Sequence, residues 1–279
     1  MVYRDIQILA EDSPAGAARA AVAGGLAAHW GGRLTGLFPK TGFPPDMLTA
    51  EGMGYLPPQT FQTMIDEQAQ AIDQAAAKAQ AVFEAAAKVA GVAAEWAQVE
   101  TQGADLIERA RCADLLVMAP TARTCLGGPV LTAASIAMAN GGPVLVTPET
   151  AEISAVGQRV LIAWNGSREA ARALRDAGPF LARAGEIHVL TIAHGSLDEG
   201  PHDQALRRRL EPYYAKTTFS RQSGQGGADS EILRRHVKAL GADLVVMGLF
   251  GHARLREWVL GGVSQDLLVA PPAALLISH

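Results

Sequence analysis

The sequence ADLLVMAP, residues 113–120, returns almost unchanged as ADLVVMGL at residues 242–249. Each copy is a short apolar run, which is typical of a strand buried on both faces of a parallel sheet. A second matching pair, ILAED at residues 8–12 and LIAWN at residues 161–165, precedes each copy. The sequence therefore predicts that one α/β unit occurs twice in the chain.

Apolar strand-like runs alternate with helical patterns in both halves. In the first half we expect strands and helices at residues 6–10, 15–29, 33–38, 62–90, 93–99, 104–112, 114–119, 126–139 and 143–147. In the second half we expect them at residues 159–164, 167–184, 186–192, 202–210, 216–220, 229–240, 243–248, 265–270 and 273–277. Parallel strands require helical crossovers. The predicted fold class is α/β, with two tandem domains, each a doubly wound five-stranded parallel sheet with helices on both faces.

The domain boundary is expected near residues 148–157, giving domains at residues 1–150 and 151–279. The two repeated pairs are offset by 129 and 153 residues, so the first half carries 24 extra residues (153 − 129 = 24). We assign these to the proline-rich loop at residues 39–58 and to the long helix behind it.

Composition and charge narrow the class of protein. The 279 residues are 49% hydrophobic and carry a net charge of −4, so nucleic acid is not an expected partner. No apolar run is long enough for a membrane span, and the first residues do not resemble a signal peptide. The two cysteines, Cys112 and Cys125, form no disulfide framework or metal spacing, which favours a cytoplasmic location.

A glycine-rich stretch, MGLFGHARLREWVLGGVS at residues 247–264, follows the repeated strand of the second half. Ligands of doubly wound sheets bind at the carboxyl ends of the strands. Gly248 stands at such an end, where glycine permits positive φ and close approach of the backbone. Gly261 and Gly262 lead to Ser264, which we expect either to cap the helix at 265–270 or to donate to a phosphate. The alternative interpretation is that these glycines are turn residues only.

At this point the chain resembles a tandem universal stress protein, a member of the adenine-nucleotide-binding (alpha hydrolase-like) α/β superfamily. VLIAWNGSREAARAL and ADLVVMGLFGHARLREWVLGGVSQDLL carry the resemblance. ATP-binding members of this family show Gly-x2-Gly-x9-Gly followed by Ser or Thr. Gly248, Gly251 and Gly261 match that spacing, Gly262 replaces the first hydroxyl, and Ser264 matches a second one.

The resemblance implies a nucleotide site in the second domain, with ATP as the cofactor and Ser264 as the side-chain contact if Mg²⁺ accompanies it. The implied site residues are Ala163, Trp164, Asn165, Thr191, Gly248, Leu249, Gly251, His252, Gly261, Gly262, Val263 and Ser264. Asn165 stands where the family has an acidic residue, and an amide is a weaker acceptor for ribose hydroxyls than a carboxylate. The hydroxyl missing at Gly262 is expected to weaken phosphate binding by about 1.5–3 kcal/mol.

The matching stretch of the first domain, MAPTARTCLGGPVLTAAS, departs from the pattern. Ala119 and Ala122 replace the first two glycines, and Pro129 removes a backbone donor. We infer that this domain has lost the site and pairs with the second domain as an internal pseudo-dimer. The strand at 273–277 serves either that internal pairing or a homodimer.

Several further side chains are open to two interpretations. His252 and Arg254 either approach a phosphate or lie in a solvated loop, and Trp164 either stacks on a base or packs in the core. His194, Asp198, His202 and Asp203 lie close in sequence, but their spacing fits no metal pattern.

We find no catalytic residues, because no Ser-His-Asp or paired-carboxylate arrangement is visible. We therefore expect a cytoplasmic stress-response protein that binds ATP or another adenine nucleotide and acts as a regulator with an unknown protein partner, not as an enzyme. Two rival functions remain: a dimerisation protein that binds no nucleotide, and a slow ATPase.

Overall fold

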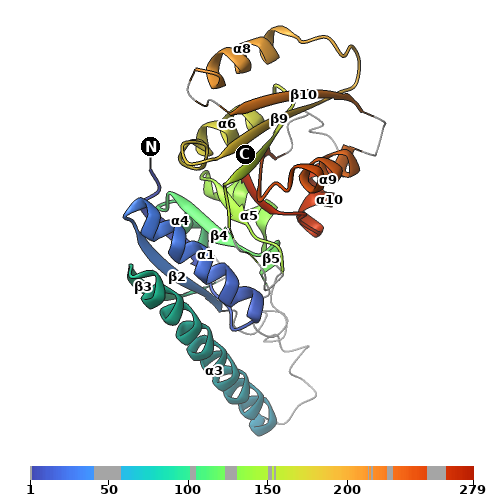
Figure 1. Ribbon diagram of the computed structural model, residues 1–279. Coiled ribbons are helices and arrows are strands. Elements are labelled where there is room, and N and C mark those ends of the chain that lie inside the picture. The colour runs from blue at the N-terminus through green and yellow to red at the C-terminus, as the bar shows by residue number, and fades with distance from the viewer. Residues whose placement is uncertain are drawn as a thin grey trace.

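The structure is a computed structural model, shown in Figure 1. It describes residues 2–40, 58–100, 105–122, 131–149, 153, 155–212, 214, 216–224, 229–249 and 262–279. Across these ranges, no helix is both long enough and apolar enough to cross a membrane.

The first half contains five parallel strands in the order β3-β2-β1-β4-β7. The strands are β1 (Asp5–Leu9), β2 (Arg33–Lys40), β3 (Ala93–Glu100), β4 (Leu115–Met118) and β7 (Val144–Val146). The helices are α1 (Pro14–Trp30), α3 (Pro58–Ala90), α4 (Asp105–Ala110) and α5 (Ala133–Asn140). A separate antiparallel pair is formed by β5 (Thr121–Ala122) and β6 (Leu131–Thr132).

The second half repeats this topology with the strand order β10-β9-β8-β11-β12. The strands are β8 (Arg159–Trp164), β9 (Glu186–Ala193), β10 (Thr217–Ser223), β11 (Leu244–Gly248) and β12 (Ala274–Ser278). The helices are α6 (Arg168–Asp176), α7 (Gly178–Leu181), α8 (Pro201–Leu210), α9 (Asp229–Leu240) and α10 (Gly262–Val269). The predicted fold class is confirmed, while the boundary between residues 150 and 151 stays a prediction.

The two halves join edge to edge. β12 pairs with β7 in antiparallel orientation, which makes one ten-stranded sheet. In Figure 1 the first half runs from blue to green and the second from yellow to red, with this pairing between them. The strand expected at 273–277 is therefore engaged inside the chain.

Apolar side chains alternate between two layers on opposite faces of the sheet. Val246 of β11 packs in the layer that contains Ala173 of α6. Its neighbour Val245 packs in the other layer, with Leu233 of α9 and Leu267 of α10. Both faces of the strand are covered, which explains why the repeated segment is a continuous apolar run.

The aspartate of each repeated segment has the same structural role. Asp114 Oδ2 accepts hydrogen bonds from the backbone N–H groups of Arg4 and Asp5, at 2.8 and 2.9 Å. Asp243 Oδ1 accepts from the backbone of residues 157–159 at 2.7–3.2 Å. Each carboxylate thus holds the start of the first strand of its half against the fourth.

Two predicted helices were wrong in their extent. The helix expected at 126–139 begins at Ala133, because Thr132 lies in β6 and accepts the Ser135 N–H as the N-cap. The helix expected at 167–184 is divided into α6 and α7. Pro179, the second residue of α7, has no N–H to continue the hydrogen-bond ladder of α6.

Candidate functional site

The strands β8, β9 and β11 are parallel neighbours, so their carboxyl ends lie at one edge of the sheet. Trp164 ends β8 and lies opposite Thr191 of β9, and Gly248 ends β11. These predicted residues therefore gather at the edge where ligands of doubly wound sheets bind. The predicted contacts Gly251, His252 and Gly261 lie outside the described residues, as does the rival candidate Arg254.

Close packing of α6 on the end of β11 requires a glycine at position 248. A Cβ at this position would lie 2.4 Å from the Ala170 backbone nitrogen and 2.4 Å from the Glu169 carbonyl carbon. The first turn of α6 thus packs directly on the end of β11. Of the two properties that glycine permits, the close approach of a backbone is used here by α6, while Gly248 is not among the positive-φ glycines.

The loop between β8 and α6 is organised by short hydrogen bonds. Asn165 Oδ1 accepts the Ser167 N–H at 3.0 Å, and Ser167 Oγ accepts the Ala170 N–H at 3.1 Å. Gly166 between them has a φ of +73°, which favours glycine. Asn165 is exposed and Ala163 half-buried. The N-terminus of α6 therefore faces the candidate site with Asn165 beside it.

An acidic side chain at the candidate site, Glu169, is buried in the first turn of α6. Burial by itself would raise the pKa of this carboxyl. The helix-terminal backbone N–H and the Arg168 guanidinium, at 2.9–3.0 Å, outweigh burial and hold the pKa of Glu169 below its usual range. A carboxylate therefore balances the positive end of this helix.

The helix after the glycine-rich stretch begins at Gly262, three residues earlier than predicted. Ser264 is its third residue and is 8% exposed, so of the two roles expected for Ser264 the structure excludes the N-cap. Gly262 is therefore a helical residue, whereas the alternative interpretation made it a turn residue only. A glycine at the first helical position costs little, because the N–H groups there have no intrahelical acceptor in any case.

Among the residues that the structure describes, nothing covers the start of α10. Gly262 is exposed, and no described atom lies within 4 Å of a Cβ placed there. Val263 is half-buried, and Leu249, at the other end of the loop, is buried and donates its N–H to the Ser278 carbonyl at 2.9 Å. The N–H groups of the first turn of α10 can therefore serve an anion from solvent.

Two of the implied site residues, Trp164 and Thr191, are both largely enclosed. Trp164 is 8% exposed and packs in the core layer of α6, with its Nε1 buried and unpartnered within the described chain. Thr191 is also 8% exposed and donates through Oγ1 to Asp203 Oδ1 at 3.4 Å. Of the two interpretations of Trp164, core packing describes its surroundings.

The four residues weighed as metal ligands do not form one cluster. Asp203 is buried and accepts hydrogen bonds from Arg221 and from the Gly200 N–H. His202 Nε2 lies 3.4 Å from Asp203 Oδ1, while Asp198 Oδ2 accepts a hydrogen bond from the Ser196 hydroxyl. In the described ranges, no three His, Cys, Asp or Glu side chains are grouped so as to hold a metal ion.

His194 has a different partner, Asp229, whose Oδ2 lies 2.8 Å from the histidine Nε2. This pair was not predicted, because the two residues are 35 positions apart in the sequence. The signal that could have found this pair is the predicted order of strands and helices. His194 follows the end of β9 and Asp229 opens α9, so both lie at the carboxyl edge.

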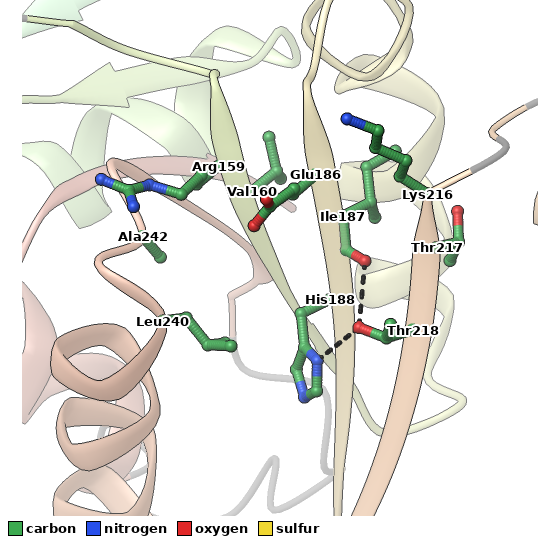
Figure 2. A pocket seen from close by; sticks show the side chains of 10 residues that line it. All are labelled: Arg159, Val160, Glu186, Ile187, His188, Lys216, Thr217, Thr218, Leu240 and Ala242. Carbon is green, nitrogen blue, oxygen red and sulfur yellow. Dashed lines mark hydrogen bonds between the residues drawn. The ribbon is translucent and has the colours of Figure 1, made fainter.

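The larger cavity lies at the opposite edge of the sheet. It has a volume of about 350 Å³ and is lined by Arg159, Val160, Glu186, Ile187, His188, Lys216, Thr217, Thr218, Leu240 and Ala242. Figure 2 shows this pocket at the amino ends of the strands, with the His188 ring bonded to Thr218. None of the predicted site residues lines it. A smaller cavity of about 60 Å³ adjoins Thr191 and Asp203.

Comparison with known proteins supports the assignment of the second half. Residues 157–279 match the model of the universal stress protein family. The structure resembles a universal stress protein from Archaeoglobus fulgidus (16% identity, 98% of each chain covered, TM-score 0.69). It also resembles a putative universal stress protein from Pseudomonas aeruginosa (16% identity, covering 99% of this chain and 93% of that one, TM-score 0.58).

A functionally unknown protein from Pseudomonas aeruginosa also matches, at 15% identity over 99% of this chain and 92% of that one, with a TM-score of 0.56. At these identities the solved structures establish the shared fold over the whole length. No curated protein matches the chain.

Proposed function

We propose that the universal stress protein domain at residues 157–279 binds ATP or another adenine nucleotide and acts as a nucleotide-dependent regulator in the stress response. The phosphates would lie against the first turn of α10, and the nucleoside against the end of β8. The other half, which lacks the first two glycines of the motif, would serve as the permanent partner of this domain.

The observation that carries this proposal is the open start of α10 at the carboxyl edge. Gly262 is exposed at the first position of the helix. The first turn of α6 reaches the same edge through its contact with Gly248. At α6 the Ser167 hydroxyl and the Glu169 carboxylate already occupy the first turn, so the N–H groups and the dipole of α10 are what favour a polyanion there.

The residues present fit a nucleotide with reduced phosphate contacts. Backbone N–H groups of residues 262–264 and the Ser264 hydroxyl are the donors that would hold the phosphates. Bound Mg²⁺ would supply charge neutralisation between phosphate oxygens, with Ser264 as its side-chain neighbour. Asn165 would meet the ribose through its amide, since one face of its oxygen already accepts from Ser167.

A nucleotide can regulate a protein only if it binds one conformation of that protein more tightly than another. Phosphates at residues 262–264 would contact α10, which leads directly into β12, the strand that joins the two halves. Nucleotide binding would therefore bias the packing of this junction and the surface offered to a protein partner.

Calorimetric titration of the full chain with ATP tests the proposal. The informative variant is Gly262→Asp, because an acidic residue suits a helix N-terminus but repels phosphate. The control is Gly25→Asp, which adds the same charge at another exposed glycine with no described atom within 4 Å of the added Cβ. We expect wild type and control to bind, and Gly262→Asp to lose at least tenfold in affinity.

Absence of binding at millimolar ATP would overturn the proposal in favour of a dimerisation protein without nucleotide. Equal binding by wild type and Gly262→Asp would place the nucleotide elsewhere. Repeating the titration with ADP, AMP and cyclic AMP ranks the nucleotides, since only contacts at α10 depend on the number of phosphates.

A further inference from the structure

His194 and Asp229 form an oriented pair at the carboxyl edge of the second half. The His194 Nε2 lies 2.8 Å from Asp229 Oδ2, and the two side chains are 56% and 14% exposed. The carboxylate is thus enclosed, while the imidazole extends into solvent. A histidine held by a buried carboxylate is the arrangement that enzymes use to present a general base.

The backbone of Gly224 also holds the imidazole ring in place. A Cβ on Gly224 would lie 2.4 Å from His194 Cε1, so only glycine leaves room for the ring. The Gly224 N–H donates to the Ala193 carbonyl at 2.8 Å, which fixes this backbone beside β9. The ring is therefore positioned from two sides, by Asp229 and by Gly224.

The pair adjoins the helix that the proposed function assigns to phosphate. Ser230, next to Asp229, donates through Oγ to Asp266 Oδ2 of α10 at 2.9 Å. Arg234 of α9 donates to the Asp266 carbonyl at 2.8 Å. Asp266 is two residues beyond Ser264, and Figure 1 shows α9 and α10 side by side. These contacts pack the first turns of α9, which begins at Asp229, against the middle of α10, and His194 is linked to this helix pair through Asp229.

We propose that His194 is the general base of a nucleotide-hydrolysing activity in this domain, and this inference rests on the proposed function. Nδ1, which faces away from the bond to Asp229, takes a proton from a water molecule. The water oxygen forms a bond to the terminal phosphorus while the bond from that phosphorus to the bridging oxygen breaks. The electron pair of the broken bond stays on the leaving nucleotide, and His194 returns its proton to solvent.

Asp229 acts as a positioning residue. By accepting from Nε2, it keeps the proton on that nitrogen and leaves the lone pair of Nδ1 free. It also stabilises the imidazolium that forms when Nδ1 takes the proton of the water. This role explains why a carboxylate is enclosed at the start of α9.

Phosphate release from Mg·ATP by the full chain measures the activity. We expect His194→Gln to lower the rate at saturating ATP about 100-fold or more, in the range that general bases contribute. His29→Gln, an exposed histidine on α1, is the control and should keep the wild-type rate. A His194→Gln variant with the wild-type rate would overturn the proposal.

Two further measurements separate a base from a structural contact. The rate of the wild type should rise with pH and then level off, as for a general base that must lose its proton, whereas the His194→Gln rate should lack this rise. Asp229→Asn should shift this profile without abolishing nucleotide binding. A profile that is unchanged in both variants would contradict the assignment.

The glycine offers a test that removes no functional group. Gly224→Ala should displace the ring and lower the rate, at little cost in folding because the exposed ring can swing into solvent. Gly195→Ala is the matched control, since no described atom lies within 4 Å of a Cβ there. ATP binding is titrated for every variant. Binding without turnover in the wild type would refute the hydrolysis proposal alone, and no binding would refute the proposed function.

Discussion

Leu276 of β12 lies opposite Leu145 of β7 in an antiparallel pair, and both side chains are fully buried. All other pairings in the ten-stranded sheet, as far as the structure describes it, are parallel. The edge strand of each half thus completes the sheet of the other. We therefore expect the two halves to unfold together in one cooperative transition.

A cluster of aromatic rings also crosses this junction. Phe180 of α7 is fully buried, and its ring centroid lies 5.8 Å from that of Tyr3 and 5.1 Å from that of Trp30. Phe180→Ala should lower the free energy of unfolding by about 3–5 kcal/mol, because it leaves a cavity between the halves.

Urea denaturation measures this loss, and Leu197→Ala, at a residue 55% exposed, is the control that should change stability by less than about 0.5 kcal/mol. A loss below about 1 kcal/mol for Phe180→Ala would mean that these rings contribute little to the junction.

Gly248→Ala tests the packing of α6 on β11. The added Cβ would lie 2.4 Å from backbone atoms of Glu169 and Ala170, and backbone atoms cannot yield as a flexible side chain can. We expect the free energy of unfolding to fall by about 1–3 kcal/mol, as at other overpacked sites.

The matched variant is Gly25→Ala, in the exposed interior of α1 with no described atom within 4 Å of the new Cβ. This change should raise stability by up to about 1 kcal/mol, because alanine is the better helix former. Thermal or urea melts of the two variants should therefore move in opposite directions. A neutral Gly248→Ala would show that glycine is not required there.

The repeat and the strand alternation made the fold predictable, because short runs buried on both faces have a strong local signature. The end of β11 was predictable for the same reason. The start of α10 was not, since two consecutive glycines resemble a helix break and the first turn tolerates them. His194 and Asp229 were also missed, because only the third dimension brings the end of β9 to the start of α9.

Gly262→Ser tests the expected weakness of the proposed phosphate site. The position is exposed and open, so the new side chain meets no described atom within 4 Å. A hydroxyl there would restore the Ser or Thr of the family pattern and add one hydrogen bond to a charged group. We expect ATP to bind about 10- to 100-fold more tightly.

The control for Gly262→Ser is Gly262→Ala, which changes the backbone in the same way but adds no donor. Calorimetry should show the gain for serine only. An equal gain for alanine would assign the effect to the ordering of α10, and no gain for either would contradict a phosphate contact at this position.

His188 predicts a pH dependence of stability. Its Nδ1 and Nε2 each lie 2.7 Å from a hydroxyl, those of Thr218 and Ser220, and its ring stacks on His236 at 6.1 Å. Burial first, and the charge of His236 second, lower the pKa of His188 below its usual value of 6.5. Figure 2 shows Glu186, Arg159 and Lys216 around the same pocket.

Because the folded state holds His188 neutral, the unfolded state binds more protons at pH values between the lowered pKa and 6.5. Stability therefore rises with pH across this window, and the stabilising contribution of neutral His188 is lost as the pH falls below about 6.5.

Replacing His188 with Gln keeps hydrogen-bonding groups near Thr218 and Ser220 but removes the titration. Urea denaturation at pH 7.5 and pH 5.0 should show a smaller loss of stability in this variant than in the wild type. His29→Gln, on the exposed surface of α1, should keep the wild-type difference, and an equal loss in all three proteins would exclude His188 as its source.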